Sequence, residues 1–171
     1  MKKLIIAASI VCAAAITHAS TVIWGLNAPV DSTIYASGTA YLICVNDLAK
    51  PTLSAETAAD WYAANSASLA GKAFRTGDVV DGAFNTSEDI SSPTGRKNYW
   101  LLIDNNVDGD DHYIAVSTTT KALNITTSSL NISAAWDGGS QMSNFNVAPE
   151  PTSGLLLLLG FAGLALKRKR A

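Results

Sequence analysis

The chain has 171 residues, with 12 lysines and arginines against 14 aspartates and glutamates, and 48% of its residues are hydrophobic. This length suits one domain. The charges are segregated, because residues 20–147 hold six basic residues against thirteen acidic ones, a net charge of −7. A surface of that sign repels phosphate, so the composition argues against a nucleic-acid partner.

Residues 1–19 have the pattern of a secretory signal peptide. Two lysines precede an apolar run of thirteen residues, and a short polar step ends at Ala19. At about 1.5 Å per residue a helix over this run is roughly 20 Å long, shorter than the roughly 30 Å hydrocarbon core of a membrane. We therefore expect a signal helix that is cut between Ala19 and Ser20, with the secretion machinery and signal peptidase as partners.

Residues 148–171 contain three parts in order. Pro149, Glu150 and Pro151 come first, and a hydrophobic run over 154–166 follows. The segment ends with the basic residues Lys167, Arg168, Lys169 and Arg170. The prolines oppose a regular helix at the motif, while the apolar run favours a membrane and the cations favour its cytoplasmic side. A simple membrane anchor accounts for the run and the charges but not for the proline–glutamate–proline motif.

This segment resembles the PEP-CTERM sorting domain of bacterial proteins, and the resemblance covers residues 147–171 only. It implies recognition of Pro149, Glu150 and Pro151 by an exosortase, a membrane-embedded cysteine transpeptidase-like enzyme, with the four basic residues as the stop. It also implies a precursor held transiently in the inner membrane by a transmembrane helix. The product would lie at the cell surface or in the extracellular matrix, with exopolysaccharide as a further partner.

Residues 20–135 predict a mainly β body, either a β-sandwich or an open barrel-like fold, with one helix. Runs of β-branched and aromatic residues separated by glycine, asparagine and aspartate indicate the strands. These runs cover 21–24, 33–45, 79–80, 99–103, 113–117, 123–127 and 130–133.

The predicted helix covers about 54–70, with Ser54 as its cap and Gly71 as its stop. Ala58, Trp61, Tyr62 and Leu69 share one face of it, which indicates a packing role. Residues 136–147 are rich in glycine, serine and asparagine, and we expect a linker there between the body and the sorting signal.

The most specific candidate site in the body is the acidic stretch 104–112. Asp104, Asn106, Asp108 and Gly109 match the first, third, fifth and sixth positions of a calcium-binding loop. The twelfth position, however, is Ala115 where a bidentate glutamate is needed. Asp108 and Gly109 also form a strong turn signal between two hydrophobic runs, so we favour a β-hairpin over a calcium site.

Two further surfaces have more than one interpretation. The tract 116–135 contains eleven serine, threonine and asparagine residues among twenty, and a solvated strand face is favoured over glycans at the acceptor-like sequences of Asn85, Asn124 and Asn131. The aromatic residues either fill the core or form a platform for sugars, and we favour the core. They comprise Trp24, Trp61, Trp100, Trp136 and five tyrosines.

The body offers little for catalysis. After the expected export, Cys44 is the remaining thiol and His112 the remaining histidine, and we interpret Cys44 as a small buried hydrophobe. We assign no catalytic, cofactor-binding or metal-ligating residue and expect a non-enzymatic surface or matrix protein. A carbohydrate-binding module is the alternative, and a small secreted hydrolase acting through two carboxylates is less favoured.

Overall fold

The structure is a computed structural model that describes residues 20–90, 94–126 and 131–148. Several predicted features lie outside these residues. They are the signal helix with Ala19, the hydrophobic C-terminal helix, the motif Pro149, Glu150 and Pro151, and the basic residues Lys167, Arg168, Lys169 and Arg170.

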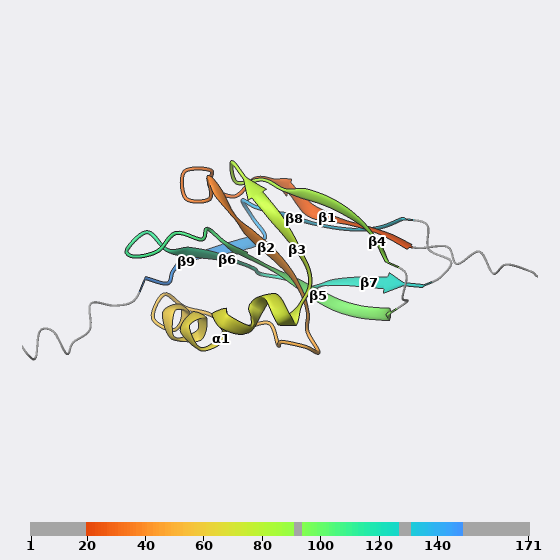
Figure 1. Cartoon of the computed structure of the whole chain (residues 1–171), viewed down its shortest axis with the longest axis horizontal. Coiled ribbons are helices and arrows are strands. Elements are labelled where there is room, and N and C mark those ends of the chain that lie inside the picture. Colours follow the sequence, from red (N-terminus) through yellow and green to blue (C-terminus); the bar gives the residue numbers. More distant parts are fainter. Residues whose placement is uncertain (1–19, 91–93, 127–130, 149–171) are drawn as a thin grey trace, which may run out of the picture.

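The described chain is mainly β with one helix, as predicted, and its sheets are open (Figure 1). Its elements are β1 (Ser20–Ala28), β2 (Ser37–Cys44), α1 (Ala58–Lys72), β3 (Ala73–Val80), β4 (Asn85–Ile90), β5 (Gly95–Asp104), β6 (Tyr113–Ser117), β7 (Lys121–Ile125), β8 (Asn131–Asp137) and β9 (Met142–Asn146). One sheet has the order β4-β1-β8. The other has the order β3-β2-β5-β6-β9, with β7 paired to β5 beyond the end of β6.

The two sheets share one hydrophobic core. Val22 and Trp24 of β1 and Trp136 of β8 contribute to the same cluster of buried side chains as Leu42 of β2 and Leu101 of β5. The β1 and β8 side chains come from the three-stranded sheet, whereas the β2 and β5 side chains come from the six-stranded sheet. Alternate residues of each strand therefore point between the layers, as the two-residue period of a strand requires.

Helix α1 covers the other face of the six-stranded sheet. A second cluster, with Ala58 and Leu69 of α1 against Trp100 and Leu102 of β5, fills the space beneath it. Because one face of β5 meets the first core and the other meets the helix, every residue from 99 to 104 is buried. This explains why β5 is continuously apolar from Tyr99 to Ile103 rather than alternating.

The helix differs from its prediction at both ends. It begins at Ala58, after a turn in which the Thr57 N–H donates to the Ser54 carbonyl, so Ser54 precedes the cap position. Gly71 lies inside the helix rather than after it. No left-handed residue ends α1, because the chain passes directly into extended backbone at Ala73 and begins β3. The shared packing face is confirmed, since Ala58 and Leu69 are buried.

The predicted linker over 136–147 is wrong. Strand β8 continues to Asp137, a turn follows, and β9 pairs with β6 from Met142 to Asn146. Oδ1 of Asp137 accepts hydrogen bonds from the N–H groups of Gly139 and Ser140, which closes the turn. After the buried Met142, exposed residues of β9 alternate with half-buried ones, which suits an outer strand. The composition of such a strand resembles that of a linker.

Candidate functional site

The acidic stretch 104–112 forms the connection of a β-hairpin, which confirms the favoured interpretation. Strands β5 and β6 pair antiparallel on either side of it, with Asp104 opposite Ile114. Asn106 and Gly109 adopt positive φ angles of 54° and 88°. Such angles favour asparagine and glycine, so the two residues account for the tight path of this loop.

Asn105 holds the loop from the inside. Its side chain is 2% exposed and its amide donates to the carbonyl of Asp111 at 2.8 Å. Its Oδ1 accepts from the N–H groups of Val107 at 3.2 Å and Tyr113 at 3.1 Å. A buried amide with donors and acceptors all matched fixes one loop conformation.

Asp104, the first residue of the calcium-like pattern, points into the protein. Its Oδ1 accepts from the N–H of Asn106 at 2.8 Å and lies 3.0 Å from Nε2 of His112. Its Oδ2 accepts from the hydroxyl of Tyr62 on α1. Both carboxylate oxygens therefore have protein partners. No group of three histidine, cysteine or acidic side chains suited to a metal ion occurs among the residues that the structure describes.

Tyr62 and His112 also contact each other directly. Their rings meet edge to face, with centroids 4.7 Å apart and an interplanar angle of 79°. Burial raises the pKa of the Tyr62 hydroxyl, and its hydrogen bond to the nearby Asp104 carboxylate raises the pKa further. The Tyr62–Asp104–His112 network thus joins helix α1, the end of β5 and the residue that precedes β6.

This loop also holds the end of the folded body. The N–H of Val147 donates to the carbonyl of His112 at 2.9 Å, and Nδ2 of Asn146 donates to the carbonyl of Asp110 at 2.9 Å. The N–H of Ala148 donates to Oδ1 of Asn146 at 2.8 Å. We call the residues Asp110, His112, Asn146, Val147 and Ala148 the exit junction.

The side chain of Val147 strengthens this attachment. It is 4% exposed and belongs to the hydrophobic cluster beneath α1. The register of β6 and β9 places Tyr113 opposite Asn146, so the strand pair continues up to the junction. The packed body therefore extends to Val147, and Ala148 alone separates it from Pro149.

Among the residues assigned to processing, Ser20 is described by the structure. It is the first residue of β1, is 2% exposed, and its hydroxyl donates to the carbonyl of Thr126. The start of β1 and the end of β9 lie toward opposite ends of the long axis of the body (Figure 1). The segments expected to be removed thus leave the body at different ends.

The sugar platform suggested as an alternative role for the aromatic residues is wrong for three of the four tryptophans. Trp24, Trp100 and Trp136 are fully buried, so their ring faces are closed to a ligand. Nε1 of Trp100 donates to the carbonyl of Leu48 at 2.8 Å. Trp61 is half-buried and packs edge to face on Trp100, with centroids 6.2 Å apart. Their common role is packing.

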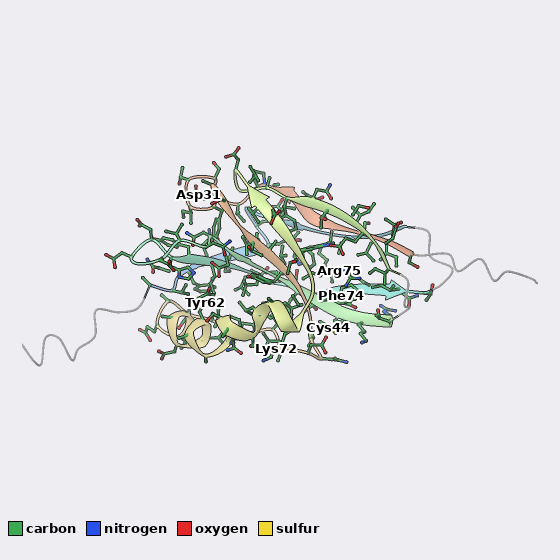
Figure 2. All side chains as sticks on the ribbon, viewed as in Figure 1. Asp31, Cys44, Tyr62, Lys72, Phe74 and Arg75 are labelled. Carbon is green, nitrogen blue, oxygen red and sulfur yellow. The ribbon has the colours of Figure 1, made fainter. Side chains whose placement is uncertain are left out.

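Cys44 and His112 lie in separate surroundings. The thiol is 2% exposed and packs in the core between the sheets, as predicted. Figure 2 shows Cys44 and Tyr62, the neighbour of His112, toward opposite ends of α1 along the long axis. The structure therefore does not assemble these two residues into a nucleophile and base.

Two hollows open on the surface of the described body. One of about 140 Å³ lies beside Lys50 and Phe145, and one of about 200 Å³ lies along β1 and β8 near Asn27 and Ser133. Neither is lined by His112, Asp104 or Cys44. These two hollows therefore do not contain the side chains considered above for catalysis or metal binding.

No family model matches the chain, and no curated protein or solved structure is found to be similar to it. Within the described ranges, no helix is both long enough and apolar enough to cross a membrane.

Proposed function

We propose that this protein is a bacterial cell-surface or extracellular-matrix protein that is exported by a signal peptide and processed at its C-terminus by an exosortase-type enzyme. Its body is a β-sandwich with a structural or matrix-interaction role and no catalytic activity. The precursor is held briefly in the inner membrane and the product is released to the surface.

The order of the C-terminal sequence carries this proposal. The motif Pro149, Glu150 and Pro151 starts directly after the exit junction, and the apolar run and the four basic residues follow. Six residues, 148–153, separate Val147 from the apolar run. At about 3.5 Å per extended residue they span roughly 20 Å, so in a membrane-held precursor the body lies close to the bilayer. A membrane-embedded enzyme would meet the motif there.

The charge distribution supports the same arrangement. The body is acidic, whereas basic residues gather at both ends of the precursor. Positive charges remain on the cytoplasmic side of a membrane, so both ends would stay there while the body is translocated between them. Cutting at both ends would release a protein with a net negative charge.

Substitution of the motif tests the proposal. The full chain is expressed in its source organism as wild type, as the double variant Pro149→Ala with Pro151→Ala, and as the neighbouring control Thr152→Ala. We expect intact-mass measurement to show loss of the basic residues in the wild type and the control, and their retention in the double variant. Equal processing of all three chains would contradict recognition of the motif.

A carbohydrate-binding module is less well supported. The hollow near Asn27 and Ser133 offers polar groups along β1 and β8, but the tryptophan rings that would stack on a sugar are buried. Binding of an exopolysaccharide by the purified body, lost after Asn27→Ala, would favour this alternative over a purely structural role.

A further inference from the structure

The exit junction leaves little free chain before the sorting motif. Val147 is held through its N–H and its buried side chain, and Asn146 is held through both its side-chain amide and its pairing with Tyr113. A peptide bond inside this segment reaches the active site of a processing enzyme only when the junction opens. The described structure therefore sets a limit on where the tail can be cut.

We propose that the exit junction positions the tail for removal, so that the cut falls C-terminal to Val147 and β9 remains in the mature protein. This proposal rests on the proposed function, because it concerns the same processing event. Asn146 is the central positioning residue. Its Nδ2 binds the carbonyl of Asp110 and its Oδ1 receives the N–H of Ala148.

The Tyr62–Asp104–His112 network supports the junction from beneath. The carbonyl that receives the Val147 N–H belongs to His112, whose ring is held by Asp104 at 3.0 Å and by the ring of Tyr62. Tyr62 in turn is fixed to Asp104 by its hydroxyl. The position of the exiting chain is thereby linked to α1.

Retention of β9 also follows from the cost of losing it. Met142 is buried in the core between the sheets, and Val147 is buried beneath α1. A cut before Met142 would expose both clusters and leave the outer edge of β6 unpaired. Cutting of the folded body on the N-terminal side of Ala148 therefore requires local unfolding and is expected to be slower.

Limited proteolysis of the purified full chain tests the junction without involving an exosortase. A broad-specificity protease is applied to the wild type, to Asn146→Ala, and to Ser143→Ala as a control on the same strand. In the wild type and in Ser143→Ala, we expect every early cut near the C-terminus to fall on the C-terminal side of Val147. For Asn146→Ala, cutting within 142–147 is expected to be on the order of tenfold faster, because two hydrogen bonds are lost.

Two results would contradict the proposed closed junction. One is a first cut of the wild type within 142–147, and the other is an equal rate of cutting there in Asn146→Ala and Ser143→Ala. Asn146→Asp keeps the acceptor for Ala148 but loses the donor to Asp110, and we expect an intermediate rate. Thermal unfolding of every variant accompanies the digestion, so that general loss of stability is distinguished from local opening.

The C-terminal ends of native protein from the source organism test the positioning itself. We expect one end C-terminal to Val147 in the wild type and mixed ends for Asn146→Ala. A native chain that has lost the tail and β9 would overturn the positioning while leaving the sorting function in place. A native chain that retains the four basic residues would overturn both positioning and sorting, and the digestion would still decide whether the junction is closed.

Discussion

The hydroxyl of Tyr62 donates a hydrogen bond to Oδ2 of Asp104, and this contact joins α1 to the end of β5. It links two residues 42 positions apart in the chain. The acceptor is a buried carboxylate that also lies against His112. The sequence of the loop alone does not predict this contact, because Tyr62 lies in a distant helix.

Removing this hydroxyl is expected to weaken the fold. Tyr62→Phe keeps the ring but leaves Oδ2 of Asp104 without its donor, at a cost of about 1.5–3 kcal/mol for a bond to a charged group. Tyr113→Phe, on the adjacent strand β6, is the matched control and is expected to change stability by less than about 0.5 kcal/mol. Denaturant unfolding of both variants measures the difference, and equal free energies would contradict the role of Tyr62.

Alkaline pH is expected to destabilise the body. Burial raises the pKa of Tyr35 and Tyr62 above the value of 10.0 for a free tyrosine, and the Asp104 carboxylate raises both further. Below pH 10 both states keep these protons. Above pH 10 the unfolded chain releases protons that the folded chain retains, so stability falls as pH rises toward the folded pKa values.

Melting temperatures measured from about pH 8 to pH 12 check this expectation. The fall should be less steep in Tyr62→Phe, which lacks one of the tyrosines whose pKa is raised in the folded body. A melting temperature that does not change across pH 10 would contradict it.

A glycine substitution tests the packing between the turn after β3 and the chain after β1. Gly82 has φ of 73°, and a Cβ there would overlap the carbonyl oxygen of Val30. Gly109 has φ of 88° but open space around it. Gly109→Ala is expected to cost about 1 kcal/mol for its backbone conformation alone, and Gly82→Ala at least about 2 kcal/mol more. Equal losses in thermal or denaturant unfolding would show that the contact with Val30 is unimportant.

Truncation distinguishes a linker from a strand at 136–147. A chain of residues 20–148 is expected to unfold cooperatively. A chain of residues 20–137, which lacks β9, is expected to have a free energy of unfolding lower by several kcal/mol. The buried side chains of Met142 and Val147 are absent from this chain, and the burial of each contributes about 1.5–3 kcal/mol. Calorimetry of the two fragments compares them, and similar melting temperatures would mean that β9 adds no stability.

The sequence predicted the mainly β class because most strands are runs of β-branched and aromatic residues bounded by glycine, asparagine and aspartate. The sequence did not predict β4, since Asn85–Ile90 contains one buried residue, Ile90, and among the described strands β4 pairs with β1 alone. The sequence did not predict β9 for a similar reason, since Met142 is its one buried residue. An outer strand buries few side chains, so its composition resembles that of a loop.

The candidate site was predictable in part. The turn signal at Asp108 and Gly109 identified the hairpin correctly, because it depends on local backbone preferences. The exit junction depends instead on the pairing of residues far apart, such as His112 with Val147. Local patterns carry no information about such contacts. The small polar residues of 136–147 are the reason why the sequence did not predict β9, the strand that precedes the proposed sorting signal.

The central claim is that the precursor loses its C-terminal signal and that the folded body remains whole. Intact-mass and terminal-peptide measurement of native protein from the surface fraction of the source organism tests it most directly. We expect a chain that begins at Ser20, ends C-terminal to Val147 and lacks Lys167, Arg168, Lys169 and Arg170. A surface protein that still carries these four basic residues would contradict the claim.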